Sequence, residues 1–146
     1  MKPLRLLLAD DHILVRAGLR ALLDGIEGIA VVAEADNGEQ AVALAEQHRP
    51  DIALLDITMP GMNGLQAAER ILRELPDTRV LILSMHAGDE YVTQALKLGV
   101  SGYLLKDAAT LELQAALEAV AGGASYLSPR ITDQLLQSKG LRPPDA

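Results

Sequence analysis

Five polar side chains stand where short apolar runs end in this 146-residue chain, and they are the first candidates for chemistry. Three carry a carboxylate, one a hydroxyl and one an amine: Asp10, Asp11, Asp56, Ser84 and Lys106. Each of them alone is more often a loop acid, a helix cap or a surface residue than a functional group. Strands that alternate with helices present their carboxyl ends on one rim of a sheet, so we expect all five to meet there. This convergence favours a functional site.

Three neighbouring carboxylates predict a bound cation. Carboxylates a few Å apart repel by on the order of 1 kcal/mol per pair in water, and more strongly near a protein surface. Mg²⁺ would offset this repulsion, since it prefers one or two carboxylates, a carbonyl, waters and a phosphoryl oxygen. The chain has no cysteine, and neither His12 nor His86 has a partner at metal-ligand spacing, so zinc and copper are not expected. We interpret both histidines as solvated neighbours of the rim.

The same residues could hold a phosphoryl group. On Asp56 such a group would meet Mg²⁺ at one oxygen, the Lys106 ammonium at another and the Ser84 hydroxyl at the third. Phosphoryl transfer depends mainly on positioning and charge neutralisation, and carboxylates serve as nucleophiles in other phosphotransfer systems. These residue types therefore indicate phosphorylation of Asp56.

The sequence around Asp56 predicts how this carboxylate is held. The apolar run 52–55 indicates a fully buried strand that ends at Asp56. Pro60 and two glycines favour a rigid loop, from which Asn63 is expected to cap a helix. The apolar positions of that helix recur at helical spacing: Leu65, Ala68, Leu72 and Leu75.

The rest of the chain repeats this strand and helix pattern. Strands are expected at 4–9, 29–33, 52–55, 80–83 and 100–105. Helices are expected at 12–24, 38–48, 64–75, 89–98 and 111–121. Strict alternation predicts a doubly wound α/β fold, with a five-stranded parallel sheet, right-handed crossovers and helices on both faces.

Local signals predict the ends and faces of these helices. Asp11 and Thr110 are expected to cap the first and fifth helices, and Asn37 with Gln40 resembles a capping box for the second. Gly99 is expected to end the fourth. Apolar residues at helical spacing mark one face of the first helix: Ile13, Leu14, Ala17, Ala21 and Leu22. Three residues of the fourth helix are expected to face inward: Val92, Ala95 and Leu96.

Composition excludes several classes of function. Hydrophobic residues make up 49% of the chain and aromatic residues 2%, which indicates a globular core of aliphatic side chains. The absence of cysteine excludes disulfides and thiolate chemistry. A net charge of −7 argues against a nucleic-acid surface on this chain, because phosphate binding needs clustered Lys and Arg. The apolar run near the N-terminus is too short for a signal peptide or membrane span, so we expect a cytoplasmic protein without membrane contact.

The C-terminal segment differs from the repeating pattern. We expect the folded domain to end near residue 127, with the segment 128–146 forming a short helix and a linker. Ser128 and Pro129 favour a helix start, with Ile131 and Leu135 on one side. The polar, proline-bearing stretch 139–146 is typical of a linker.

The motifs together resemble the receiver domain of bacterial two-component response regulators. The resemblance covers roughly residues 4 to 127, and it rests on four matches: Asp10-Asp11, the stretch 54–64, Ser84 and the stretch 102–106. It implies a flavodoxin-like sheet of order 2-1-3-4-5 and Asp56 as the phosphoacceptor. It also implies Mg²⁺ bound by Asp10, Asp11, Asp56 and the Thr58 carbonyl, Lys106 on the phosphoryl group, and Ser84 with Tyr103 as the switch.

The implied function is signalling rather than enzymatic turnover. A sensor histidine kinase would supply the phosphoryl group, and the domain would catalyse only its own phosphorylation and dephosphorylation. One departure is Asp107, since many receivers carry proline there with a cis bond, which costs more before a non-proline residue.

Finer motifs resemble the NarL-type transcription regulators, which carry a C-terminal LuxR-type helix-turn-helix domain. The matching stretches are 9–12, 15–20, 83–86, 103–107 and 126–129. No such DNA-binding domain lies within these 146 residues, so we expect an isolated receiver fragment. Contact with DNA would come only through that output domain, and a homodimer is expected on phosphorylation.

Three other interpretations remain at this stage. A stand-alone receiver would act through protein–protein contacts instead of through an output domain. A phosphatase of the haloacid dehalogenase type resembles Asp-x-Asp, but Thr58 occupies the second position here. A flavodoxin-like nucleotide binder needs a phosphate loop after the first strand, where this chain has two acids.

Overall fold

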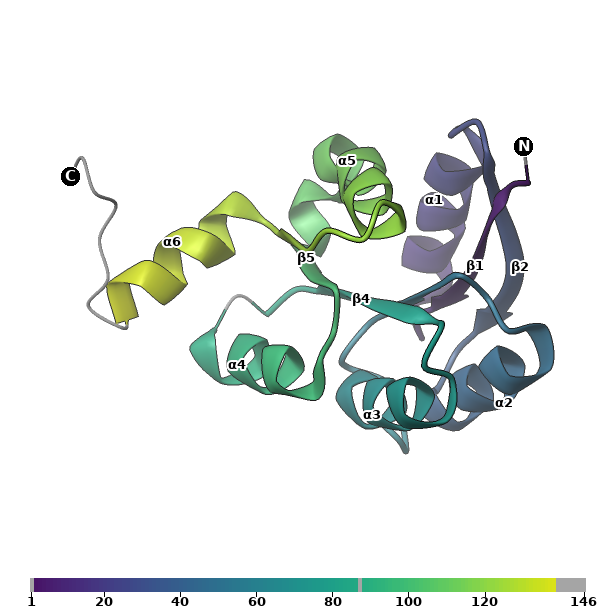
Figure 1. The fold of residues 1–146 in the computed structure, drawn as a ribbon, viewed down its shortest axis with the longest axis horizontal. Coiled ribbons are helices and arrows are strands. Elements are labelled where there is room, and N and C mark those ends of the chain that lie inside the picture. Colours follow the sequence, from purple (N-terminus) through teal and green to yellow (C-terminus); the bar gives the residue numbers. More distant parts are fainter. Residues whose placement is uncertain (1, 87, 139–146) are drawn as a thin grey trace.

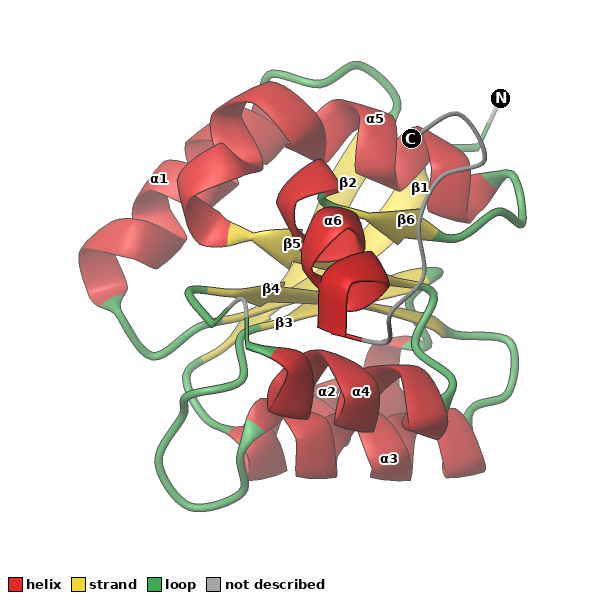
Figure 2. Cartoon of the chain, turned by 90° about the vertical axis from the view of Figure 1, so that its left-hand side faces the viewer, coloured by secondary structure: helices red, strands yellow, loops and turns green. Residues whose placement is uncertain are grey.

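A parallel sheet covered by helices on both faces forms the body of the protein (Figures 1 and 2). The computed structural model describes residues 2–86 and 88–138. The sheet has the order β2-β1-β3-β4-β5-β6, and every pairing is parallel. Its strands are β1 (Leu4–Ala9), β2 (Ile29–Ala35), β3 (Ile52–Leu55), β4 (Arg79–Ser84), β5 (Gly102–Leu105) and β6 (Tyr126–Leu127). The helices are α1 (Ile13–Asp24), α2 (Gly38–His48), α3 (Gly64–Glu74), α4 (Asp89–Leu98), α5 (Ala109–Ala121) and α6 (Pro129–Ser138), with a 3-10 turn, η1 (Lys106–Ala108).

The predicted fold class and the order 2-1-3-4-5 are confirmed, and the sheet has one strand more than expected. β6 pairs with the outer edge of β5, with Tyr126 opposite Gly102 and Leu127 opposite Tyr103. Two residues are too few to show the alternation by which a strand is recognised. The domain boundary at residue 127 stays a prediction, and the predicted linker at 139–146 lies outside the described residues.

Two hydrophobic layers sandwich the sheet (Figure 2). α2, α3 and α4 cover one face, and α1 and α5 cover the other. Successive strand residues alternate between the layers: in β3, Ala53 and Leu55 belong to the first and Ile52 and Leu54 to the second. Because β3 is apolar and buried on both faces, the first polar side chain on this segment is that of Asp56, at the carboxyl end of the strand.

The N-caps of α3 and α2 agree with the sequence, and those of α1 and α5 differ. Asn63 caps α3 with a complete capping box. Asn37 caps α2 by accepting a hydrogen bond from the Gln40 amide, but the predicted capping box is incomplete, because the Gln40 side chain accepts from the Asp36 amide. Gly99 ends α4 as predicted. The expected caps at Asp11 and Thr110 are wrong. α1 begins one residue later, after His12, and α5 begins at Ala109, after the 3-10 turn.

The faces of two helices also differ from expectation. Ile13 and Leu14 are 73% and 87% exposed, and α1 is buried instead through Leu19 and Leu23. In α4, Val92 and Ala95 are buried as predicted, whereas Leu96 is 40% exposed. Apolar spacing alone does not show which of two adjacent helix faces meets the sheet. Within the described residues, no helix has the length and apolar character needed to cross a lipid bilayer.

Gly64 packs α3 directly against the end of β3, which generates a stability prediction. A Cβ on Gly64 would lie 1.9 Å from the Asp56 carbonyl oxygen, whereas a Cβ on Gly18 in α1 meets nothing within 4 Å. We expect Gly64→Ala to destabilise the protein by about 1–3 kcal/mol or more through overpacking. The matched Gly18→Ala should stabilise it by roughly 0.5–1 kcal/mol, because alanine favours the helix. Urea unfolding of both variants tests the pair, and equal effects would contradict the close approach.

Candidate phosphoacceptor site

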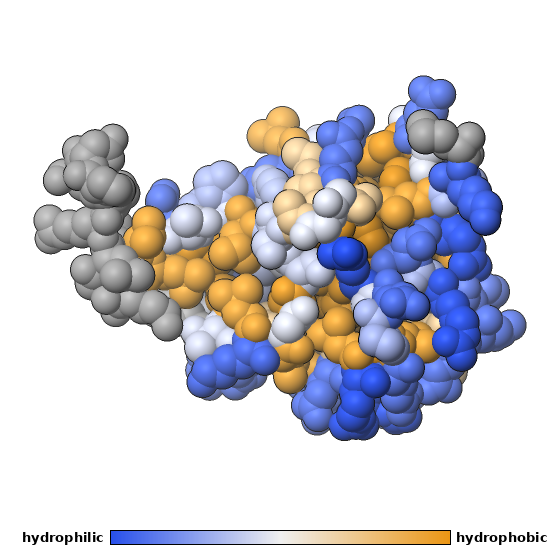
Figure 3. All heavy atoms as spheres, in the orientation of Figure 1, coloured by the Kyte–Doolittle hydropathy of each residue, from blue (hydrophilic) through white to orange (hydrophobic). Residues whose placement is uncertain are grey.

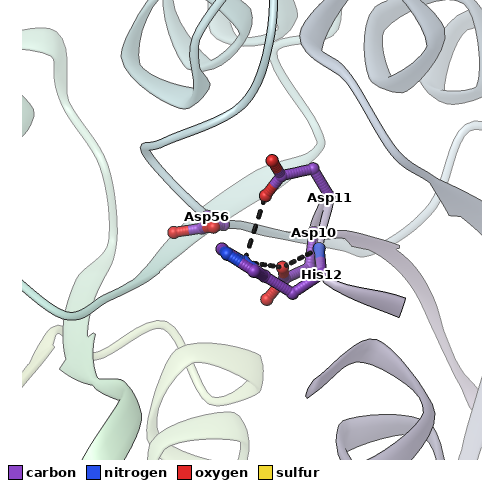
Figure 4. A group of neighbouring side chains, drawn as sticks. All are labelled: Asp10, Asp11, His12 and Asp56. Carbon is purple, nitrogen blue, oxygen red and sulfur yellow. Dashed lines mark hydrogen bonds and ion pairs between the residues drawn. The ribbon is translucent and has the colours of Figure 1, made fainter. Parts of the chain in front are cut away.

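The strand ends bring the predicted charged residues together at one rim. Lys106 follows β5, and its Nζ lies 2.8 Å from Asp10 Oδ2 and 3.1 Å from Asp56 Oδ2. Asp56 follows β3, and Asp10 and Asp11 follow β1. Figure 4 shows the three carboxylates gathered at the strand ends, with His12 joined to Asp10 and Asp11 by dashed lines. The peptide bond after Lys106 is trans.

Burial sets the electrostatics of this site. Asp10 and Asp56 are 1% and 3% exposed, and the Lys106 side chain is 9% exposed. Burial raises the pKa of Asp56, and the neighbouring Asp10 charge adds to this, while Lys106 and the Thr58 amide oppose it. For Lys106, burial lowers the pKa, but the contacts with Asp10 and Asp56 outweigh burial and the net shift is upward. A single ammonium is thus held between two buried carboxylates.

Two carboxylate oxygens show that the site suits a cation. Asp10 Oδ2 and Asp11 Oδ1 are buried and accept no hydrogen bond. Asp10 Oδ2 lies 2.8 Å from Lys106 Nζ, and Asp11 Oδ1 lies 3.2 Å from His12 Nδ1, but neither pair has hydrogen-bond geometry. Buried acceptors that receive no well-aligned hydrogen bond carry a free-energy cost that a metal ion relieves. Carboxylate oxygens are hard ligands of the kind that Mg²⁺ prefers, so the donor set fits that ion.

His12 lies closer to the acids than the sequence suggested. Its ring is 58% exposed, but Nδ1 lies 3.3 Å from Asp10 Oδ1 and 3.2 Å from Asp11 Oδ1. One ligand atom from each of four residues, Asp10, Asp11, His12 and Asp56, falls within 4.8 Å of the others. Its position directly after two acids was the signal available in the sequence.

A second histidine, His86, contacts the loop after β3, the helix α4 and the strands β4 and β5. Its Nε2 lies 3.1 Å from the Thr58 hydroxyl, and its ring stacks on Tyr91 with centroids 4.6 Å apart. Its amide donates to the Ser84 hydroxyl at 2.9 Å, and its carbonyl accepts from the Tyr103 hydroxyl at 2.6 Å. The interpretation of His86 as a solvated neighbour missed these contacts. They join residues up to 28 positions apart, for which no local pattern exists.

Tyr103 and Ser84, the predicted switch residues, are both fully buried. Burial raises the pKa of the Tyr103 phenol, against an opposing interaction with Ser84. The Ser84 hydroxyl bonds within its own loop, to the His86 amide. The two predicted switch residues are therefore joined through the backbone of His86.

The start of α2 contacts the loop after Asp56. This contact was not predicted from the sequence. The Gly38 amide donates to the Met62 carbonyl at 3.0 Å, and Glu39 Oε1 accepts from the Met62 amide at 3.2 Å. A Cβ on Gly38 would lie 2.1 Å from that carbonyl oxygen. This contact fixes the segment that follows Thr58.

Comparisons with known proteins identify relatives over most of the chain. Residues 6–118 match the family described as response regulator receiver domain. The chain is 40% identical over 134 residues to the transcriptional regulatory protein DegU of Brevibacillus brevis, which covers 92% of this chain and 57% of that protein. Response regulator GacA of Pseudomonas aeruginosa is 39% identical over 132 residues, covering 90% of this chain and 62% of GacA. The chain thus spans about three fifths of these curated relatives.

Solved structures agree with these matches. A two-component response regulator of the LuxR family from Aurantimonas sp. SI85-9A1 has a TM-score of 0.91 and 36% identity, covering 95% of this chain and 99% of that one. The fold and the arrangement of the strand ends are therefore shared with a protein of that description.

The buried charge of Asp56 generates a pH-dependent stability prediction. An acid whose pKa is raised by folding binds its proton more tightly when folded, so its ionisation destabilises the fold as pH rises through that pKa. With a chelator present at pH 7, Asp56→Asn should stabilise the protein by on the order of 1 kcal/mol. The gain should shrink toward acid pH, where Asp56 itself is protonated. Thermal unfolding across pH measures this, with exposed Asp77→Asn as the control, and a less stable Asp56→Asn at pH 7 would contradict it.

Proposed function

Because the chain belongs to the response regulator receiver domain family, we propose that it is a phosphorylation-controlled signalling switch. In this proposal a sensor histidine kinase in the cytoplasm donates a phosphoryl group to Asp56. The observation that carries it is the Lys106 ammonium, which lies 2.8 Å from Asp10 Oδ2 and 3.1 Å from Asp56 Oδ2 within a group of three carboxylates. In the proposed function the carboxylates would bind a cation, and the Lys106 ammonium would bind a phosphoryl group.

Each residue has a defined part in the transfer. A carboxylate oxygen of Asp56 attacks phosphorus, forming an O–P bond while the N–P bond of the donor phosphohistidine breaks. Lys106 neutralises charge on the transferred oxygens, and its fixed position limits the reorganisation needed. Asp10, Asp11, Asp56 and the Thr58 carbonyl would hold Mg²⁺. When bound, that ion supplies charge neutralisation and orients the phosphoryl oxygens.

The switch would act through the loop after β4. The Ser84 hydroxyl accepts from the His86 amide, which leaves its proton available, and it would donate a hydrogen bond to a phosphoryl oxygen on Asp56. Moving Ser84 alters the loop that also holds Tyr103 through the His86 carbonyl. The Tyr103 ring is already fully buried, so inward rotation of this ring on phosphorylation stays a prediction. Phosphorylation would thus bias a loop with two arrangements.

The relatives support a proposal for the output of the switch. DegU is named a transcriptional regulatory protein, and this chain covers 57% of its length. We propose that the receiver controls a DNA-binding helix-turn-helix domain that lies C-terminal to it in the whole protein. The alternatives are a stand-alone receiver that acts by protein contacts and an aspartate-nucleophile phosphatase. The phosphatase lacks support, because Thr58 stands where such enzymes place a second acid, and its hydroxyl contacts His86.

Labelling tests the assignment of Asp56. With acetyl phosphate and Mg²⁺, the wild-type chain should gain the mass of one phosphoryl group, and Asp56→Asn should gain none. Lys106→Ala should slow labelling by about 10²-fold or more, as expected for loss of a preorganised electrostatic group. Asp77→Asn, an exposed acid at the opposite end of the sheet, is the matched control and should label normally. Equal labelling of Asp56→Asn would refute the proposal.

We also propose that phosphorylation drives this chain to form a homodimer. Beryllofluoride with Mg²⁺ imitates the aspartyl phosphate and should raise the mass in solution from monomer to dimer. Analytical ultracentrifugation measures the change, and Asp56→Asn should stay monomeric under the same conditions. A wild-type chain that binds beryllofluoride but remains a monomer would count against dimerisation of this segment.

A further inference from the structure

The C-terminal segment Tyr126–Ser138, called the docked tail below, is bonded to the strand that carries Lys106. β6 extends the sheet along β5, and the Ser128 amide donates to the Tyr103 carbonyl at 3.0 Å. α6 then leads away from the sheet edge and contacts α4 (Figure 1). Hydrophobic surface gathers over the start of α6 and between α4 and α5 (Figure 3). Ile131 from this helix is fully buried in the core.

The Ser128 hydroxyl replaces a missing sheet partner for the last residue of β5. The Leu105 amide donates to Ser128 Oγ at 3.0 Å, at a point where β6 has already ended. Leu105 is 2% exposed and Ser128 is 1% exposed, so water does not reach this bond freely. A buried amide requires an acceptor, and the hydroxyl of the docked tail supplies it.

Glu112 from α5 fixes the direction of that bond. The Ser128 hydroxyl donates to Glu112 Oε1 at 2.9 Å, and the Tyr126 hydroxyl donates to the same oxygen at 2.8 Å. A hydroxyl has one proton, so giving it to Glu112 leaves a lone pair directed to the Leu105 amide. Burial and the neighbouring carboxylate raise the pKa of Tyr126 to about 12, so its proton stays in place at neutral pH.

Leu105 matters because Lys106 follows it directly. The Leu105 amide is bonded to the Ser128 hydroxyl one residue before the 3-10 turn that starts at Lys106. The Lys106 ammonium must remain near Asp10 and Asp56, so a displacement of this backbone is transmitted to the rim. Arg130 of α6 and Asp107 of the 3-10 turn form an exposed ion pair at 3.3 Å, which adds a weaker contact between the docked tail and the residue after Lys106.

We propose that Ser128 and Glu112 are positioning residues for Lys106, so that docking of the tail and phosphorylation of Asp56 are coupled. This inference rests on the proposed phosphoacceptor role of Asp56. Coupling between two sites is reciprocal: a docked tail favours phosphorylation, and the phosphorylated site changes the stability of tail docking. The docked tail therefore helps to position Lys106, and its own stability depends on whether Asp56 is phosphorylated.

Amide hydrogen exchange in the wild-type 146-residue chain tests the coupling without any variant. Mg²⁺ and beryllofluoride should change the exchange rates of the Leu105 and Ser128 amides by about fivefold or more. Asp56→Asn with the same additions should show no change. If beryllofluoride shifts the Asp56 resonance while the exchange of both amides stays constant, the coupling is refuted and the phosphoacceptor role survives. If beryllofluoride does not bind, the proposed function itself fails.

Variants test the positioning role separately. Ser128→Ala should slow acetyl phosphate labelling of Asp56 by about fivefold or more, relative to the exposed Ser125→Ala as matched control. The Mg²⁺ dissociation constant, measured by titration calorimetry, should not change, because the acids after β1 are untouched. Ser128→Thr keeps a hydroxyl and should recover most of the rate. Normal labelling by a folded Ser128→Ala, or a loss of rate that follows a loss of Mg²⁺ affinity, would overturn the proposal.

Discussion

The balance between one buried ammonium and the buried carboxylates around it is the constraint on which the rest of the structure depends. Lys106 Nζ lies near both Asp10 and Asp56, each nearly inaccessible to solvent. Removing charges from water costs several kcal/mol per ion, and only close, well-placed partners offset that cost. The three strand ends must therefore be fixed with respect to one another. Continuous apolar strands, packed on both faces, supply that rigidity.

The balance is incomplete, and this gives the site its chemistry. Asp11 joins the other two acids, so the rim carries more negative than positive charge, and two acid oxygens lack hydrogen bonds. In the proposed function a divalent cation would offset this excess, and a phosphoryl group on Asp56 would then add negative charge next to Lys106. Each step would change the forces on Lys106 and on the Ser84 loop. If the site were neutral and all its hydrogen bonds were already made, a ligand would gain little interaction energy there and would shift no equilibrium.

The sequence predicted the parts of this site that are built from local patterns. The strand 52–55 agrees with β3, because an apolar run between polar ends has one simple interpretation. The position of Lys106 beside Asp56 followed from topology alone. What could not be predicted depends on long-range contacts: Thr58 with His86, and Leu105 with Ser128, which are 28 and 23 positions apart. The prediction of the buried face of α1 was wrong for a related reason. The spacing of Ile13 and Leu14 does not show whether another element covers them, and both are exposed.

β5 is where the site and the C-terminal segment meet, and its position explains why. In a doubly wound sheet, β5 is the last strand whose carboxyl end reaches the rim, and its outer edge is open to whatever follows in the chain. Here β6 and Ser128 close that edge, and they do so opposite Tyr103 and Leu105, next to Lys106. Covering an edge strand is a structural need of any such sheet. In this protein β6 and Ser128 cover the edge of β5, and Lys106 follows that strand directly. The proposed coupling between the acids and the docked tail therefore needs only Lys106, Leu105 and Ser128.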